Sequence, residues 1–409
     1  MSRAFYVYRK LNNDKVIKEL IEYLESGTCD NTLLIGLLLE NGEKMGFRGN
    51  LINDYIAYLL ALDENAYTLM AERRGRVGGC VEKVLLKDIA LIREIMALSG
   101  DSEFCKGDVS LLMDFMNDNE HEKYFNHRIR DGLEKLALAL SNSADNETFL
   151  DELGNYYARN GVGEFGLFKA FRIKDDELAP IITTEHMRFD DLIGYEMQKE
   201  MLRNNTEAFL RGEPANNCLL FGDAGTGKSS SIKALLNEYY DEGLRMIEVY
   251  KHQFKSLDHI VEQIKDRNYR FIIYMDDLSF EDFEIEYKYL KAVIEGGLAK
   301  RSGNLLIYAT SNRRHLIRER YSEKLERDED MNTRDTVQEK LSLADRFGLK
   351  IFYGVPDKKG FNNIVLTLAR REGITLSDEE LYEEANKWQV SHGSFSGRTA
   401  RQFINYLRS

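Results

Sequence analysis

From Asn216 onward, short runs of consecutive apolar residues alternate with longer segments in which apolar residues recur every three or four positions. The short runs have the length of strands, and continuously apolar strands are typical of a parallel sheet that is covered on both faces. The longer segments have the spacing of helices, so the alternation predicts an α/β fold. We therefore expect a five-stranded parallel sheet with helices on both faces. The predicted strands are Cys218–Phe221, Met246–Tyr250, Phe271–Met275, Leu305–Thr310 and Leu349–Tyr353.

The N-terminal part of the chain has a different, mainly helical pattern. Its segment Phe165–Ile173 alternates enough to be a strand, and the connector Leu178–Phe189 that follows contains Pro180. Proline is incompatible with helix interiors and central strands, so Pro180 indicates a boundary. We expect a mainly helical N-terminal domain with its connector over residues 1–185. Apolar residues at i, i+3 and i+4 predict helices in Asp14–Glu25, Asn50–Leu62 and Ile129–Leu140.

The chain after Pro356 is again helical in pattern. Ser377 and Glu380 form an S-x-x-E capping box, which is typical of a helix start. We therefore expect the α/β core to occupy residues 186–355 and a small helical lid to occupy residues 356–409.

Composition and charge narrow the possible classes of protein. The chain has 409 residues, of which 43% are apolar and 31% charged, and this excludes a disordered or low-complexity protein. A net charge of -13 disfavours non-specific binding to nucleic acid or anionic membranes. The four cysteines form no CxxC pair and histidine is scarce, so we expect neither a disulfide framework nor a zinc site. Without a signal peptide or an apolar segment of membrane-spanning length, the expected location is the cytoplasm.

A glycine-rich turn follows the first predicted strand of the core. Its sequence G-D-A-G-T-G-K-S matches the phosphate-binding pattern G-x-x-x-x-G-K-[ST], between a strand and a helix as that pattern requires. Glycines let the backbone approach phosphates closely, and the N–H groups of a helix N-terminus face the anion. Lys228 would reach the β- and γ-phosphates, and the Ser229 hydroxyl would bind Mg²⁺. The residues expected to hold the nucleotide here are Gly222, Asp223, Ala224, Gly225, Thr226, Gly227, Lys228, Ser229 and Ser230.

Two other predicted strands end in polar residues. Asp276 and Asp277 follow one of them, and we expect Asp276 to hold the Mg²⁺ shell and Asp277 to orient or deprotonate the attacking water. Asp277 is one methylene shorter than the glutamate that many ATPases with this phosphate-binding pattern carry at this position, so Glu281 is an alternative base. Asn312 ends the next strand, and we expect it to bond to the γ-phosphate and the water, because ligands bind at the carboxyl ends of parallel strands.

These motifs together resemble the AAA+ superfamily of P-loop ATPases, and most closely an uncharacterised bacterial family of AAA+ ATP-binding proteins that is known as a domain of unknown function. The resemblance covers about residues 186–409 and leaves the N-terminal half without a motif. The matching segments are Phe189–Gly194, Gly222–Ser229, Asp276–Glu281, Ala309–His315, Asp345–Gly348 and Ser396–Arg401.

The resemblance implies a role for several residues outside the glycine-rich turn. Asn312 looks like the sensor 1 residue, and Arg346 looks like the arginine finger, which in this family points at the nucleotide of a neighbouring subunit. Arg398 looks like the sensor 2 residue of the lid, with Arg401 as the alternative. The segment around Leu192, which includes Ile193 and Gly194, would line the adenine pocket.

The resemblance also implies the cofactors and the assembly. It predicts ATP and Mg²⁺ bound at the interfaces of a homo-oligomer, with hydrolysis driving a conformational change in a macromolecular client chosen by residues 1–185. An alternative is a nucleotide-gated binding module with little hydrolysis, because the Asp277 side chain is short. A DNA-associated loader is a further alternative, although the acidic charge counts against it. The segment Arg313–Asp345 carries nearly equal numbers of acidic and basic residues, which predicts a solvated helical excursion.

Overall fold

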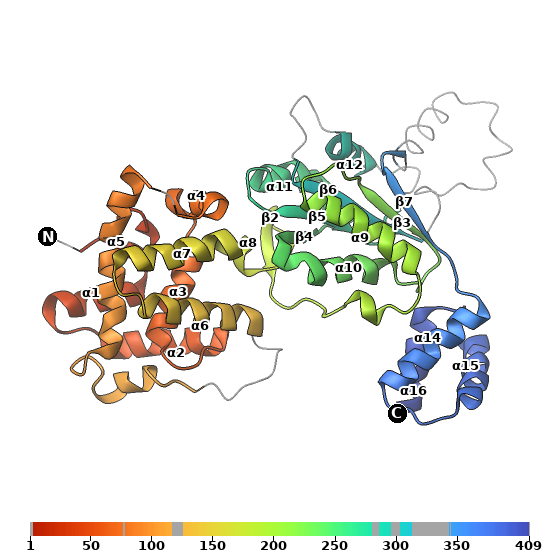
Figure 1. The fold of residues 1–409 in the computed structure, drawn as a ribbon, viewed down its shortest axis with the longest axis horizontal. Coiled ribbons are helices and arrows are strands. Elements are labelled where there is room, and N and C mark those ends of the chain that lie inside the picture. Colours follow the sequence, from red (N-terminus) through yellow and green to blue (C-terminus); the bar gives the residue numbers. More distant parts are fainter. Residues whose placement is uncertain are drawn as a thin grey trace. The chain divides into compact units, whose positions relative to one another are not determined.

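The computed structural model of the chain describes residues 3–76, 78–116, 126–279, 286–295, 303–312, 343 and 345–408. The chain divides into two compact units (Figure 1). The first unit contains Met1–Phe168 and Pro180–Thr183, and the second contains Lys169–Ala179 and Thr184–Ser409. Glu281 and nearly all of the charged segment 313–345 lie outside the described residues. None of the described helices combines the length and the apolar character needed to span a membrane.

The described part of the first unit is built from helices, as the pattern predicted. The helices predicted from Asp14 and Asn50 each begin one residue later, because these two residues are N-caps. Their side chains accept the backbone N–H of Ile17 at 3.0 Å and of Asn53 at 3.1 Å. The elements are η1 (Arg9–Asn13), α1 (Lys15–Ser26), α2 (Asn31–Met45), α3 (Leu51–Leu62), α4 (Ala66–Arg74), α5 (Cys80–Ala97), η2 (Leu98–Gly100), η3 (Gly107–Leu112), α6 (His127–Ser141), α7 (Asn146–Asn160) and α8 (Gly163–Leu167).

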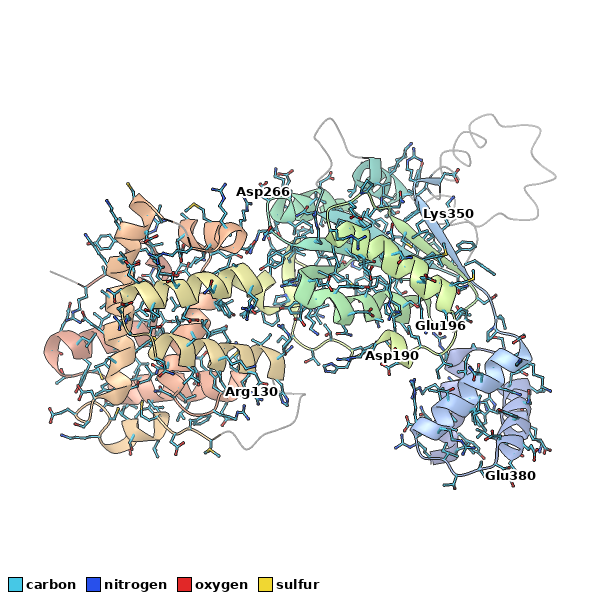
Figure 2. The ribbon with its side chains drawn as sticks, viewed as in Figure 1. Arg130, Asp190, Glu196, Asp266, Lys350 and Glu380 are labelled. Atoms are coloured by element: carbon cyan, nitrogen blue, oxygen red, sulfur yellow. The ribbon has the colours of Figure 1, made fainter. Side chains whose placement is uncertain are left out.

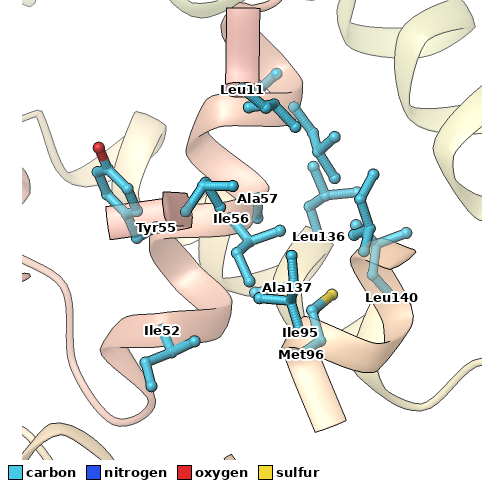
Figure 3. Packing of buried hydrophobic residues seen from close by; sticks show 14 of the residues in the cluster. Leu11, Ile52, Tyr55, Ile56, Ala57, Ile95, Met96, Leu136, Ala137 and Leu140 are labelled. Carbon is cyan, nitrogen blue, oxygen red and sulfur yellow. The ribbon is translucent and has the colours of Figure 1, made fainter. Parts of the chain in front are cut away.

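These helices share one apolar core, part of which is drawn in Figure 3. Ile52 and Ile56 of α3 are buried there with Ile95 of α5 and Leu136 of α6. Burial of one such side chain stabilises a fold by about 1.5–3 kcal/mol. The first unit is therefore a helical domain with a core of its own.

The second unit contains a sheet of seven strands in the order β2-β1-β4-β5-β6-β3-β7, so the predicted count of five is wrong. The five predicted strands are all present. The strand pairs β1–β4, β4–β5, β5–β6, β6–β3 and β3–β7 are all parallel. The strands are β1 (Ala170–Lys174), β2 (Glu177–Ile181), β3 (Cys218–Gly222), β4 (Leu244–Glu248), β5 (Arg270–Met275), β6 (Leu305–Ser311) and β7 (Leu349–Tyr353).

The two extra strands come from the segment that the sequence pattern assigns to the N-terminal domain and its connector. Only the second part of Phe165–Ile173 is extended, because the first part ends helix α8. Strand β1 then pairs with β4 of the core, where Ala170 lies opposite Met246. Strand β2 holds Pro180 and lies at the edge of the sheet, which is where a strand tolerates proline. Proline therefore indicates an edge strand here and not a plain connector.

Helices pack on the sheet in two groups. Helix α10 contacts α9, whereas α11 contacts α12. The connection through α10 runs from β3 outward to β4, and the connections through α11 and α12 run back in the opposite direction. Since parallel crossovers are right-handed, α10 lies on the opposite face from α11 and α12. The elements are η4 (Phe189–Asp191), α9 (Glu196–Leu210), α10 (Lys228–Tyr239), η5 (Tyr240–Glu242), η6 (Lys251–Ser256), α11 (Leu257–Ile264) and α12 (Glu286–Glu295).

The C-terminal bundle consists of α14 (Lys358–Arg371), α15 (Asp378–His392) and α16 (Gly397–Arg408). It has its own apolar core, in which Phe361, Leu381 and Phe403 are buried. The predicted capping box is present, because Ser377 Oγ accepts the N–H of Glu380 at 3.3 Å and Glu380 Oε2 accepts the N–H of Ser377 at 3.1 Å.

The strand register decides which residues meet at the carboxyl edge of the sheet. Phe221 of β3 lies opposite Ser311 of β6, and Met275 of β5 lies opposite Ala309 of β6. Gly222 at the end of β3, Asp276 just after β5 and Asn312 just after β6 therefore come to the same edge.

Candidate active site

The glycine-rich turn, called the P-loop from here on (Gly222–Ser229), connects β3 to α10. Gly222 has a φ of +133°, and a Cβ atom there would lie 2.2 Å from the carbonyl oxygen of Tyr353 in β7. Gly225 and Gly227 have φ values of +76° and +95°, which residues with side chains rarely adopt. Lys228 then begins α10, so the N–H groups of the first helical turn border the loop.

Lys228 is the positive charge of this loop, and its side chain is only 5% exposed. Its Nζ donates to the carbonyl oxygens of Asp223 at 2.6 Å and of Gly222 at 3.1 Å, and to Asn312 Oδ1 at 3.0 Å. Burial lowers the pKa of Lys228, although the carboxylates of Asp223, Asp277 and Asp276 oppose this shift. The ammonium group is thus held by neutral acceptors that a phosphate oxygen can replace.

Asp276 lies directly after β5 and faces the start of α10. Its Oδ1 accepts hydrogen bonds from the hydroxyls of Ser229 and Thr310, both at 2.6 Å. Desolvation would raise the pKa of Asp276, but the bonds donated by these hydroxyls outweigh it and lower the pKa. Asp276 therefore stays ionised at neutral pH.

The oxygen atoms of Asp276 and Ser229 fit the expected magnesium site. Mg²⁺ prefers oxygen ligands and is commonly bound through one or two carboxylates together with water and substrate phosphates. Among the described residues no group of three or more His, Cys, Asp or Glu side chains could hold a metal ion. Asp276 offers a carboxylate and Ser229 a hydroxyl, and water and phosphate oxygens would complete the coordination of Mg²⁺.

Asp277 has a φ of +49°, in the left-handed region. Its Oδ1 accepts a hydrogen bond from Asn312 Nδ2 at 2.8 Å, and the same amide group accepts from Lys228 through its oxygen. Asn312 thereby links Lys228 of the P-loop to Asp277. The structure brings together the lysine, the sensor-like asparagine and both carboxylates that the sequence singles out.

A cavity of about 540 Å³ extends from these residues toward the C-terminal bundle. Its lining includes charged side chains, among them Lys228, Asp276 and Arg398, and apolar side chains, among them Ile193 and Leu368. The lining residues are Met187, Asp191, Leu192, Ile193, Tyr195, Lys199, Ala224, Gly225, Thr226, Gly227, Lys228, Ser229, Ser230, Ser231, Asp276, Asp277, Thr310, Asn312, Ile364, Leu368, Gly397, Arg398 and Arg401. Three predicted binding residues, Gly222, Asp223 and Gly194, lie outside this lining.

Part of the lining comes from the segment between η4 and α9, which lies between the labelled residues Asp190 and Glu196 (Figure 2). Ile193 of this segment packs against the core of the C-terminal bundle. Lys199 is 5% exposed, and its Nζ donates to the carbonyl oxygen of Leu192 and, at 3.0 Å, to Glu196. The buried ammonium group fixes the backbone of the segment.

Tyr195 links the cavity to the segment that follows β7. Burial raises the pKa of Tyr195 to about 12, so its hydroxyl stays protonated and donates to the carbonyl oxygen of Gly354 at 2.8 Å. Asp223 of the P-loop accepts the N–H of Val355 at 2.9 Å through its carboxylate. Both contacts hold the connection between the sheet and the C-terminal bundle.

The three arginines predicted from the family resemblance occupy different positions. Arg398 adjoins the P-loop, since its backbone N–H donates to the carbonyl oxygen of Gly225 at 3.3 Å. Arg401 also lines the cavity, but its guanidinium pairs with Glu372 at 3.3 Å. Arg346 is half-buried and is not among the residues that line the cavity. The neighbouring Asp345 pairs with Lys350 at 2.8 Å.

Sequence reasoning misses several lining residues because they carry no motif. Ile364 and Leu368 have the apolar spacing of any packed helix, and Thr310 looks like one more residue of a strand end. Lys199 looks like a solvated residue of an amphipathic helix. The nearness of Thr310 to Asp276 follows from the strand register, in which Met275 lies opposite Ala309, and the sequence alone does not show this register.

Comparison with known proteins gives one family match. The family described as "Protein of unknown function (DUF815)" matches residues 167–409, which is more than half of the chain. The match leaves out most of the helical first unit. No curated protein sequence matches the chain.

Solved structures give remote similarities. The RuvB Holliday junction branch migration motor of Thermotoga maritima is 15% identical, with a TM-score of 0.37, and the match covers 54% of this chain and 64% of RuvB. The AAA domain of FIGL-1, solved in complex with ADP, is 16% identical, with a TM-score of 0.38, and the match covers 54% of this chain and 73% of that domain.

Proposed function

The chain belongs to the family described as "Protein of unknown function (DUF815)", and on this premise we propose that it is an AAA+-type P-loop ATPase that binds and hydrolyses Mg-ATP. One observation carries the proposal. Lys228, Asn312 and Asp277 form a continuous hydrogen-bonded series in the lining of the cavity, which also includes the bonded pair Ser229 and Asp276. A phosphate-binding cation, a metal-binding pair and a base therefore face the same space.

Each residue has a role that its contacts support. Lys228 would exchange the carbonyl oxygens of the P-loop for oxygens of the β- and γ-phosphates, and the N–H groups at the start of α10 would bind the same anion. Ser229 and Asp276 would hold Mg²⁺, which when bound neutralises charge on the phosphates. The base and ribose would lie near the apolar lining residues Ile193 and Leu368.

Asp277 and Asn312 would act on the attacking water. Asp277 would accept its proton, and Asn312, whose amide already bonds to Asp277 at 2.8 Å, would orient the water toward the γ-phosphate. Arg398 would bind the γ-phosphate from the C-terminal bundle, which would make the bundle a lid. ATP turnover would then move α14–α16 relative to the sheet.

We extend the proposal to an assembly of identical subunits. Arg346 does not line the cavity of its own chain among the described residues, so it would act on a nucleotide only across an interface with another subunit. A finger of this kind raises the rate of phosphoryl transfer by about 10³–10⁵-fold. The helical first unit would select a macromolecular client in the cytoplasm, on which the motion acts.

The experiment is a single-turnover measurement of ATP hydrolysis with Mg²⁺, joined to calorimetry of nucleotide binding. Lys228→Ala should lose the heat of binding. Asp277→Asn should bind ATP with the affinity of the unaltered chain and hydrolyse it about 100-fold more slowly. Asp258→Asn, which neutralises an exposed carboxylate in α11, is the matched control and should change neither. Binding that is indifferent to Lys228→Ala would overturn the proposal.

A nucleotide-gated binding module is the second candidate, and one contact favours it. Among the described residues, Asn312 bonds to Oδ1 of Asp277. The Asp277 side chain is also short for reaching a water molecule. If ATP binds normally but disappears no faster than in buffer, this candidate replaces hydrolysis as the function.

A further inference from the structure

The side chain of Thr310, near the end of β6, lies between the two carboxylate residues that follow β5. Its Oγ1 is 2.6 Å from Asp276 Oδ1 and 2.9 Å from the backbone nitrogen of Asp277. A backbone N–H only donates, and a hydroxyl has a single proton. The hydroxyl of Thr310 therefore accepts from Asp277 and donates to Asp276, and no other arrangement satisfies both contacts.

The main chain of Thr310 adds a third contact, since its carbonyl oxygen accepts the N–H of Leu278 at 2.7 Å. One residue thus holds three consecutive residues after β5. Thr310 is 2% exposed, and a β-branched side chain in a strand has few available rotamers. Because Thr310 is almost fully buried, solvent would compensate poorly for a lost bond.

The bond to Asp277 holds an unfavourable backbone conformation. With a φ of +49°, Asp277 lies in the left-handed region, which residues other than glycine seldom adopt. In this conformation its carboxylate meets Asn312 Nδ2 at 2.8 Å. Without the Thr310 hydroxyl, the backbone of Asp277 can relax and carry its carboxylate away from Asn312.

The hydroxyl of Thr310 would stay bonded to Asp276 when a metal ion replaces the bond from Ser229. Oδ1 of Asp276 receives hydroxyls from both Ser229 and Thr310. Ser229 is itself a candidate metal ligand, so metal binding would turn its oxygen toward the ion. Thr310 then remains as a hydroxyl that donates to Oδ1 and helps to orient Asp276, in the way that neighbouring groups orient metal ligands.

We propose that Thr310 is a positioning residue that holds the metal-binding carboxylate of Asp276 and the water-activating carboxylate of Asp277 in register. This inference rests on the proposed function of the same site. In this inference, Thr310, a buried residue of β6, couples metal binding by Asp276 to water activation by Asp277.

The test removes the hydroxyl without changing the shape of the side chain. Thr310→Val should lower kcat about 10- to 100-fold and raise the Mg²⁺ concentration for half-maximal hydrolysis about tenfold. Binding of ATP in the presence of a chelator should stay within about twofold, because Thr310 contacts no expected phosphate-binding group. Thr310→Ser, which restores the hydroxyl, should recover most of kcat and the Mg²⁺ response. Equal Mg²⁺ responses of Thr310→Val and the unaltered chain, or no recovery with Thr310→Ser, would overturn the inference.

Thr206→Val is the matched control for losing a buried threonine hydroxyl. Thr206 is fully buried in α9, and its hydroxyl contacts the Leu202 carbonyl oxygen and the Tyr308 hydroxyl, both at 2.9 Å. This variant should lower Tm and leave the Mg²⁺ response unchanged. A shift as large as that of Thr310→Val would make the effect one of general packing and would refute the inference.

Two further measurements keep the outcome decisive. If Thr310→Val does not bind ATP in the presence of the chelator, Thr310→Cys is used as the variant instead, because a thiol fills the space but forms only weak hydrogen bonds. If the unaltered chain hydrolyses ATP no faster than Lys228→Ala, the proposed hydrolysis fails. The Mg²⁺ affinity of the complex with a non-hydrolysable ATP analogue, measured by calorimetry, then still separates Thr310→Val from Thr310→Ser or shows them equal.

Discussion

Arg398 and Arg401 both line the cavity, yet different contacts hold them. The backbone of Arg398 is bonded to the P-loop, whereas the guanidinium of Arg401 is paired with Glu372. If Arg398 stabilises charge on the γ-phosphate, Arg398→Ala should lower kcat about 100-fold, as loss of one charge-stabilising donor does elsewhere. Arg401→Ala should stay within about threefold, because an exposed ion pair contributes little. Steady-state ATP hydrolysis checks this, and equal losses would remove the distinction.

Asp54 in the first unit makes folding sensitive to pH. The side chain is 4% exposed, and burial, with a smaller contribution from Glu134, raises its pKa to about 7. In the unfolded chain the pKa is about 3.9, so between these values the unfolded state loses the proton first. Stability therefore falls as pH rises from about 4 to 7 and stays reduced above that.

Asp54→Asn should remove this dependence. Three pKa units correspond to about 4 kcal/mol, which is the largest gain expected at pH 8, whereas almost none is expected near pH 4. Thermal unfolding of the variant and the unaltered chain at both pH values measures the difference. Asp108→Asn neutralises an exposed carboxylate and should show no such pH-dependent gain. A gain that is equal at both pH values contradicts the assignment to Asp54 ionisation.

At the scale of elements, the P-loop depends on the close approach of β3 and β7. Gly222 is positioned where a Cβ atom would lie 2.2 Å from the Tyr353 carbonyl oxygen, and its φ is +133°. Gly222→Ala should therefore force β7 away and destabilise the second unit by more than about 2 kcal/mol. Denaturant unfolding measures this loss.

Gly243 separates the two causes of that loss. It has a φ of +93°, but nothing lies within 4 Å of the position that a Cβ atom would occupy there. Gly243→Ala should therefore cost only the backbone strain, about 1 kcal/mol. If both alanine variants lose the same stability, the contact with β7 is not what requires glycine at position 222.

The segment after β7 connects the sheet beside the cavity to the C-terminal bundle. Tyr195, just before α9, and Asp223 of the P-loop bond to Gly354 and Val355 of this segment. A change in the P-loop on nucleotide binding would therefore reach the chain just before Pro356. This arrangement gives the proposed lid a physical connection to the site.

At the scale of the whole molecule, the position of Arg346 predicts complementation between subunits. Arg346→Ala and Lys228→Ala chains should each be inactive alone. Mixed oligomers contain interfaces that pair an intact Lys228 with an intact Arg346, so mixing should restore part of the ATP hydrolysis. Activity is followed across mixing ratios, with sizing to show that the chains associate. Mixed oligomers without any recovery would mean that Arg346 does not act across an interface.

The predictable part of the fold is the part with strong local signals. The five apolar runs of the core are strands within two residues of their predicted ends, and Asp14 and Asn50 cap helices where the pattern places the starts. The pattern does not assign β1 and β2 to the sheet, because one shares its alternation with α8 and the other contains Pro180 at an edge. Which sheet a short strand joins depends on its partner, and the sequence pattern does not identify partners.

The amino-acid sequence alone determines the chemistry of the P-loop, the carboxylates after β5 and the asparagine after β6, because glycine pattern, strand length and residue type are local properties. The tertiary structure decides which of these atoms meet. The contact of Thr310 with Asp276, the support of the Leu192 carbonyl by Lys199, and the lining of the cavity by Ile364 and Leu368 join residues that different elements bring together. Packing and strand register create such contacts, and neither is present in any single segment.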